Sequence, residues 1–209
     1  MSVRFQLILG THNRKKRLEL EQLLQFLPIQ LSILEDFPNA LAVEETGETF
    51  AENAALKAST QARHLEGWVL AEDSGLSVAA LNGDPGVYSA RYAGHPSNDE
   101  LNNQKLITEL KRVPEGQRTA WYTCHACLAD PSGNIVASVS GECYGRILLE
   151  RRGQSGFGYD PYFELREYHQ TFAELGLTVK SVISHRARAM RKMLPYLQNA
   201  VRQSRNSGV

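Results

Sequence analysis

Short apolar runs alternate with stretches of helical periodicity over the first part of this 209-residue chain. Each apolar run has the length of a buried strand, and each helical stretch repeats apolar residues three and four positions apart. This alternation predicts an α/β fold built on a twisted sheet. The predicted strands are Val3–Leu9, Ile29–Leu34 and Trp68–Ala71, and the predicted helices run through Leu20–Leu27 and Thr49–Ala62.

The middle and the end of the chain contain longer elements. A helix is predicted over Asp99–Lys111, followed by two long strands over Thr119–Leu128 and Ile135–Tyr144. A turn-forming segment, Asp130 to Asn134, joins these strands. A last helix follows Ser184, and its internal proline is predicted to bend it. We find no repeat and no low-complexity stretch, and residues 1–209 are interpreted as a single domain.

Bulk composition argues against several classes of function. Basic and acidic residues number 23 each, so no global field draws nucleic acid or an acidic membrane. Three cysteines do not make a disulfide framework. Cys124 and Cys127 are three apart on a predicted strand and face opposite sides, which favours a structural role over redox or zinc chemistry. With no signal peptide and no apolar run that could span a bilayer, we predict a cytoplasmic protein.

The first helix begins with cations where acidic residues are normally preferred. Residues 11–17 read Thr-His-Asn-Arg-Lys-Lys-Arg, with Asn13 or Thr11 as the N-cap. Because a helix N-terminus carries partial positive charge, each cation there costs roughly 0.3–1 kcal/mol. A bound polyphosphate reverses that cost, since free backbone N–H groups and basic side chains bind an anion together. A solvated basic turn is the alternative, and the spacing is not that of a Walker P-loop.

Two acidic pairs suggest a metal site. Glu72 and Asp73 follow the predicted strand Trp68–Ala71, and open α/β sheets bind ligands at the carboxyl ends of their strands. Adjacent carboxylates repel each other unless a cation or a proton intervenes, so Mg²⁺ is the natural occupant. Glu44 and Glu45, just before the next helix, offer a further oxygen ligand. A loop turn or a helix cap remains the alternative for either pair.

A glycine-rich segment and a second cationic helix start suggest a site for a flat ligand. Residues 153–161 read Gly-Gln-Ser-Gly-Phe-Gly-Tyr-Asp-Pro, where glycines permit close backbone approach and an aromatic ring can stack on a base. A packed glycine-rich turn would have the same sequence pattern. Lys180 precedes Ser184-His185-Arg186, in which the serine is predicted to cap the last helix. Two cationic helix starts make a shared anionic ligand more credible than two accidents.

Taken in order, seven motifs resemble the inosine/xanthosine triphosphate pyrophosphatase family, which hydrolyses noncanonical purine nucleoside triphosphates. The resemblance covers nearly the whole chain. The motifs are Thr11-x-Asn13-x-x-Lys16, Glu44-Glu45-Thr46-Gly47-x-Thr49-Phe50-x-Glu52-Asn53-Ala54, Asp73-Ser74-Gly75-Leu76, Gly83-x-Pro85-Gly86-x-Tyr88-Ser89-Ala90-Arg91-Tyr92, Gly156-Phe157-Gly158-Tyr159-Asp160-Pro161, Thr171-x-Ala173-Glu174 and Lys180-x-x-x-Ser184-His185-Arg186-x-x-Ala189.

The resemblance implies an elongated mixed central sheet, two lobes flanking a nucleotide-binding cleft, a homodimer and Mg²⁺-dependent release of pyrophosphate from ITP, dITP or XTP. It implies Asp73 as the catalytic acceptor and Glu44 and Asp73 as metal residues, and we expect Glu72, the other member of the acidic pair, to assist them. His12 and Glu72 depart from the pattern, because many relatives have glycine and aspartate there. The implied substrate-binding residues are Thr11, His12, Asn13, Arg14, Lys15, Lys16, Ser74, Phe157, Gly158, Tyr159, Asp160, Lys180, His185 and Arg186.

Three other functions fit parts of the sequence. A pyrophosphatase acting on pyrimidine or modified nucleotides differs only in its base pocket. A non-catalytic nucleotide sensor leaves the carboxylates at Glu44 and Asp73 unexplained. A nucleic-acid binder built on the basic residues after Glu174 conflicts with the neutral overall charge.

Overall fold

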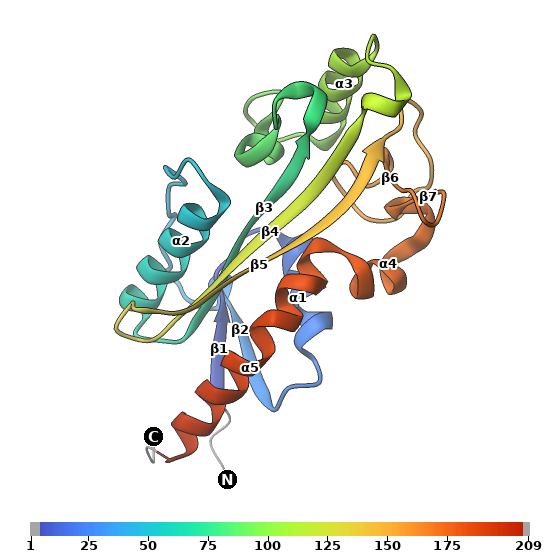
Figure 1. The fold of residues 1–209 in the computed structure, drawn as a ribbon. Helices are drawn as coiled ribbons and strands as arrows, with labels where there is room; N and C mark the ends of the chain where they lie inside the picture. The colour runs from blue at the N-terminus through green and yellow to red at the C-terminus, as the bar shows by residue number, and fades with distance from the viewer. Residues whose placement is uncertain (1–4, 207–209) are drawn as a thin grey trace. The chain divides into compact units, whose positions relative to one another are not determined.

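The computed structural model describes residues 5–206, with side chains as far as residue 204, and its elements form one mixed sheet with helices (Figure 1). The strand order is β2-β1-β3-β4-β5-β6-β7. β1 is parallel to β2 and β3, whereas β6 is antiparallel to β5 and β7, which confirms the predicted mixed α/β class. The strands are β1 Phe5–Leu9, β2 Ile29–Ile33, β3 Val69–Val78, β4 Thr119–Ala129, β5 Ile135–Ile147, β6 Phe163–Leu165 and β7 Gln170–Thr171. The predicted first strand also included residues 3 and 4, which lie outside the described part.

Local side-chain caps determine where most helices begin. Asn13 caps α1, Asn98 caps α3, and Thr49 forms a capping box with Glu52 at the start of α2. Ser184 accepts a hydrogen bond from Ala187 N–H at the start of α5, as predicted. The helices are α1 Arg14–Leu24, α2 Phe50–Leu65, α3 Asp99–Leu110, α4 Phe172–Ile183 and α5 His185–Asn206, with Pro195 inside α5; short 3₁₀ turns are η1 Leu34–Asp36, η2 Ala79–Leu81, η3 Gly86–Arg91 and η4 Glu115–Gln117.

The chain divides into two compact units, each with its own core. Unit 1 comprises residues 1–73, 124–141 and 188–209, and unit 2 comprises residues 74–123 and 142–187. In unit 1, Cys124 and Cys127 belong to two different apolar clusters, which agrees with their predicted placement on opposite faces of β4. All three cysteines are free thiols. In unit 2, Leu76, Leu106 and Phe163 belong to a single apolar cluster. The interpretation of residues 1–209 as one domain stays a prediction.

Strand β3 is longer than the sequence suggested. The prediction ended it at Ala71 and placed two carboxylates beyond it, but Glu72 and Asp73 lie inside the ten-residue strand. The strand continues because Leu76 and Val78 are buried in the core of unit 2. Its parallel neighbour β1 ends at Leu9, which pairs with Leu70. Both carboxylates therefore lie just beyond the end of β1, where the strand has lost its parallel partner.

Among residues 5–206, no helix combines the length and the apolar character needed to cross a membrane.

Candidate active site

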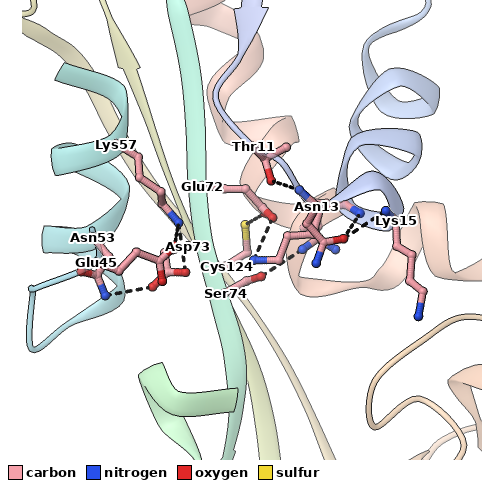
Figure 2. A network of polar contacts seen from close by, with 12 residues as sticks. Thr11, Asn13, Lys15, Glu45, Asn53, Lys57, Glu72, Asp73, Ser74 and Cys124 are labelled. Atoms are coloured by element: carbon pink, nitrogen blue, oxygen red, sulfur yellow. Dashed lines mark hydrogen bonds and ion pairs between the residues drawn. The ribbon is translucent and has the colours of Figure 1, made fainter. Parts of the chain in front are cut away.

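Asn13 caps the start of α1, and the first turn of this helix carries a cluster of cations. The Asn13 side chain accepts hydrogen bonds from the backbone N–H groups of Lys15 and Lys16, at 3.0 and 3.1 Å. Thr11 Oγ1 in turn accepts from Asn13 N–H at 3.1 Å, which holds the loop between β1 and α1 (Figure 2). Arg14 and Lys15 are exposed. The predicted arrangement of a capped helix start with cations in its first turn is therefore present.

Glu72 is buried on one side of β3, where a lysine and a cysteine are among its partners. It is 1% exposed, and its Oε1 lies 3.6 Å from the ammonium group of Lys16. The buried thiol of Cys124, on the neighbouring strand β4, donates a hydrogen bond to Glu72 Oε2 at 2.8 Å. A buried carboxylate needs charge compensation and hydrogen bonds to remain ionised. The helix that presents the cations thus also supplies the compensating charge for Glu72.

Asp73 lies on the other side of β3 and faces α2 (Figure 2). Lys57 Nζ is 3.3 Å from Asp73 Oδ1 and 2.6 Å from Glu45 Oε1, so one ammonium group joins two carboxylates. Asn53 Nδ2 donates to Asp73 Oδ2 at 3.2 Å, and Asn53 Oδ1 accepts from Gly47 N–H at 2.8 Å. A Cβ atom at Gly47 would lie 2.7 Å from Asn53 Oδ1, so the close approach of this loop to α2 requires glycine.

Burial and charge act in opposite directions on this group. Burial raises the pKa of Asp73 above its ordinary value, and Lys57 and Lys16 offset only part of that rise. Burial alone would lower the pKa of Lys57, but the attraction of Asp73 and Glu45 outweighs it, so the pKa of Lys57 is raised. Lys57 is therefore a cation at neutral pH, and Asp73 is a better proton acceptor than an ordinary aspartate.

The donor chemistry of this region fits a hard divalent cation. Glu45, Glu72 and Asp73 supply carboxylate oxygens, which Mg²⁺ prefers. Within residues 5–206, no three acidic, histidine or cysteine side chains already converge as a metal cage. Mg²⁺ in nucleotide enzymes is commonly held by one or two carboxylates together with substrate phosphates, so a preformed cage is not required. Glu44, predicted as a ligand, is exposed, and among the described contacts it is Glu45 that joins this network.

Unit 2 contains a second group of predicted site residues around the glycine-rich segment. Lys180 on α4 donates to Asp160 Oδ2 at 2.6 Å, and both side chains are buried. The same carboxylate oxygen accepts from Phe157 N–H at 2.9 Å. The ammonium group of Lys180 also lies 4.5 Å from the centre of the Phe157 ring, a cation–π contact. The structure therefore brings together the aromatic, acidic and basic residues that the sequence separates by twenty positions.

Three further predicted residues of unit 2, Tyr159, His185 and Arg186, are buried and held in defined orientations, and Ser74 is partly buried. The His185 ring stacks on Tyr122 with centroids 4.6 Å apart. Arg186 is 1% exposed and donates to Ser74 Oγ at 3.0 Å. Tyr159 donates its hydroxyl to the carbonyl of Ser89 at 2.8 Å, so this tyrosine anchors the loop. Burying so many polar groups is costly, so their concentration here makes this part of unit 2 a candidate binding site.

Sequence reasoning assigned no site role to three residues that contact the two carboxylates of β3 in unit 1: Asn53, Lys57 and Cys124. Lys57 follows Asn53 by one helical turn, so both side chains project from the same face of α2. The capping box at Thr49 predicted where α2 begins. The spacing of four residues between Asn53 and Lys57 was the available sequence signal for Lys57. No comparable signal exists for Cys124, because its contact with Glu72 depends on strand pairing between distant segments.

These groups define the class of protein: an α/β protein with a cationic helix start beside paired carboxylates in unit 1 and a cluster of polar and aromatic residues in unit 2. The chain belongs to the Ham1 family, which matches residues 7–196. It is 55% identical over 207 residues to a dITP/XTP pyrophosphatase of Rhodopirellula baltica, covering 99% of this chain and all of the relative. A dITP/XTP pyrophosphatase of Bacillus cereus is 47% identical, covering 90% of this chain and 92% of the relative.

Solved structures agree with this assignment. A Ham1 protein from Coxiella burnetii superposes with a TM-score of 0.85 at 36% identity, covering 93% of this chain and 99% of the other. The family resemblance drawn from the sequence motifs is confirmed.

The charge of Lys57 is predicted to hold the pKa of Asp73 down. Replacing Lys57 with methionine removes the largest attraction that opposes burial, so the pKa of Asp73 should rise further. The measurement is a ¹³C NMR titration of the Asp73 carboxyl group in metal-free protein. Lys57→Arg is the matched control, since it keeps the charge. An unchanged or lower pKa in Lys57→Met would contradict the assigned interaction.

Proposed function

We propose that this protein hydrolyses noncanonical purine nucleoside triphosphates, ITP, dITP and XTP, to the monophosphate and pyrophosphate, and so cleanses the nucleotide pool. The observation that carries the proposal is the pair of buried carboxylates on β3, each opposite a lysine, beside a cationic helix start. Membership of the Ham1 family, with relatives named dITP/XTP pyrophosphatases, supports the same reaction.

The triphosphate is bound by the loop and first turn of α1. The partial positive charge of the helix N-terminus and the side chains of Arg14, Lys15 and Lys16 favour an anion at this end of the helix. Thr11 and Asn13 fix the loop through their hydrogen bonds, and His12 is exposed at its tip. As pyrophosphate leaves, these donors stabilise the negative charge that it gains.

Asp73, with Glu72 and the acidic loop before α2, would hold a divalent cation such as Mg²⁺. When bound, it neutralises phosphate charge and helps to align the phosphates for displacement. In the structure Glu45 rather than Glu44 reaches the Asp73 network, so we assign the loop ligand to Glu45. This revises the ligand that the family resemblance implied.

Asp73 accepts the proton of the attacking water. Its raised pKa favours proton transfer, and it is ionised once the pH exceeds that pKa. Asn53 and Lys57 each hold one carboxylate oxygen, which fixes the direction of the group. The water oxygen bonds to the α-phosphorus, the bond from that phosphorus to the bridging oxygen breaks, and pyrophosphate leaves.

The unit 2 group reads the base. We propose that Phe157 stacks on the purine, while Lys180, His185 and Arg186 offer donors to a 6-oxo group. Tyr159, Gly158, Asp160 and Ser74 shape and orient these residues through the hydrogen bonds described above. Adenine has a donor at position 6, so it would leave buried donors unpaired, which penalises ATP.

Homodimerisation and a cytoplasmic location stay predictions. The family resemblance implies the dimer, and sedimentation velocity measures it directly.

Pyrophosphate release from ITP, dITP, XTP, GTP, ATP and dUTP, with and without Mg²⁺, tests the proposal. We expect Mg²⁺-dependent release from ITP, dITP or XTP with little from ATP. Preferential release from dUTP would instead establish a pyrimidine pyrophosphatase. Nucleotide binding without release from any substrate would establish a sensor.

Replacing Asp73 with asparagine is predicted to abolish most turnover while keeping the fold. The amide preserves shape but accepts no proton, so kcat should fall about 10²- to 10⁴-fold. Steady-state kinetics give kcat, and calorimetry with a non-hydrolysable analogue gives nucleotide affinity, which should change little. Turnover close to that of the parent protein would remove Asp73 from its role.

The two glutamates before α2 are predicted to differ in their effect on metal dependence. Glu45→Gln should raise the Mg²⁺ concentration needed for half-maximal turnover, because Glu45 lies in the Asp73 network. Glu44→Gln is the matched comparison and should have a smaller effect, since Glu44 is exposed. The reverse order would return the ligand role to Glu44.

A further inference from the structure

Two side chains of helix α3 hold the backbone N–H and C=O groups of one residue in the glycine-rich loop of unit 2, Gly158. Asp99 Oδ2 accepts a hydrogen bond from Gly158 N–H at 3.1 Å. Asn103 Nδ2 donates to the Gly158 carbonyl at 3.0 Å. The two side chains are one helical turn apart and project from the same face of α3. Side chains on a single face of α3 thus form hydrogen bonds with both the N–H donor and the C=O acceptor of Gly158.

Gly158, whose two hydrogen bonds to Asp99 and Asn103 we call the clamp, lies between the groups that are proposed to bind the base. Gly158 follows Phe157 directly, and Asp160 closes the loop by accepting from Phe157 N–H. Gly156 and Gly158 have φ angles of 80° and 59°, the left-handed region that favours glycine. At Gly156 a Cβ atom would lie 2.1 Å from Asp160 Oδ2. Such a backbone has few local preferences of its own, so external hydrogen bonds determine its conformation.

Packing alone does not explain why Asn103 is buried, because burying its amide costs more free energy than burying an apolar side chain. It is 3% exposed, and among the described residues its Oδ1 atom is buried without a hydrogen-bond partner. A buried amide with one half unsatisfied costs free energy that an apolar side chain at the same position would avoid. The contact with Gly158 is the observation that explains its presence.

We propose that Asp99 and Asn103 are positioning residues for base discrimination. By holding the N–H and C=O groups of Gly158, they fix the positions of the neighbouring Phe157 ring and Asp160 carboxylate. That carboxylate in turn orients Lys180. The inference rests on the proposed function, because it assumes that this loop binds the base. Loss of the clamp lets the loop adapt to adenine as well as to a 6-oxopurine. It should leave the carboxylates of unit 1 and the chemical step unchanged.

The test compares steady-state kinetics of alanine variants with ITP and ATP. For Asn103→Ala and Asp99→Ala we expect KM for ITP to rise roughly tenfold, the equivalent of one net hydrogen bond. We expect kcat to change by less than about threefold and the ITP-to-ATP ratio of kcat/KM to fall. Asp99→Asn keeps an oxygen acceptor for Gly158 N–H and should restore most of the ratio.

Two neighbours on the same helix serve as matched controls. Asn102 is equally buried, but its amide bonds to Ser89, Ala90 and Ala93 and not to Gly158, so Asn102→Ala reports the damage to unit 2 that does not pass through Gly158. Gln104 is exposed, and Gln104→Ala should leave both KM and the ratio unchanged.

The outcomes separate the clamp from the function that it serves. If Asn103→Ala and Asp99→Ala alter KM and the ratio no more than Asn102→Ala does, the clamp is structural and the inference is wrong. Should Asn103→Ala fail to fold, the half-exposed Asp99→Ala decides alone. A parent protein that releases no pyrophosphate from ITP or XTP would refute the proposed function itself, and would do so before any variant is compared.

Discussion

Two adjacent carboxylates buried in the middle of β3 impose the main constraint on unit 1. Glu72 and Asp73 are 1% and 5% exposed, and they point to opposite sides of the strand. Each buried charge is tolerable only with a partner of opposite charge and with hydrogen bonds to its oxygens. The cations at the start of α1 and the lysine of α2 meet that need on the two sides. Removing one partner from such a pair typically costs about 3–5 kcal/mol.

A buried pair of opposite charges also occurs in unit 2, where it has a different consequence. Asp160 and Lys180 form a buried pair, and the carboxylate of that pair also holds the backbone of Phe157. In unit 1 the buried charges lie beside a helix start that favours anions, which suits phosphate and metal chemistry. In unit 2 they lie beside an aromatic ring and a glycine-rich loop, which suits recognition of a base. Charge placement, more than the sheet itself, distinguishes the two groups.

Local signals predicted most of the fold, and the failures have a common cause. The Asn13 cap, the capping box at Thr49 and the helix at Asp99 depend on residues close in sequence, and the structure confirms them. The prediction that this strand ends at Ala71 was wrong. Two consecutive acidic residues, Glu72 and Asp73, are more typical of a loop than of a buried strand, and the lysines that pair with them are distant in sequence. Lys57 and the choice of Glu45 over Glu44 depend on how α2 packs on β3. Short strands such as β6 carry too few residues for a periodic signal.

The central claim is that Lys57 and Asp73 act as one unit in the proton transfer to the carboxylate. A double-mutant cycle on kcat with ITP tests it, using Lys57→Met, Asp73→Asn and the combined variant. If the lysine works through the aspartate, the double variant should be no slower than Asp73→Asn alone, because the second change removes a partner with nothing left to orient. Independent, multiplicative losses would contradict the claim and give Lys57 a separate role.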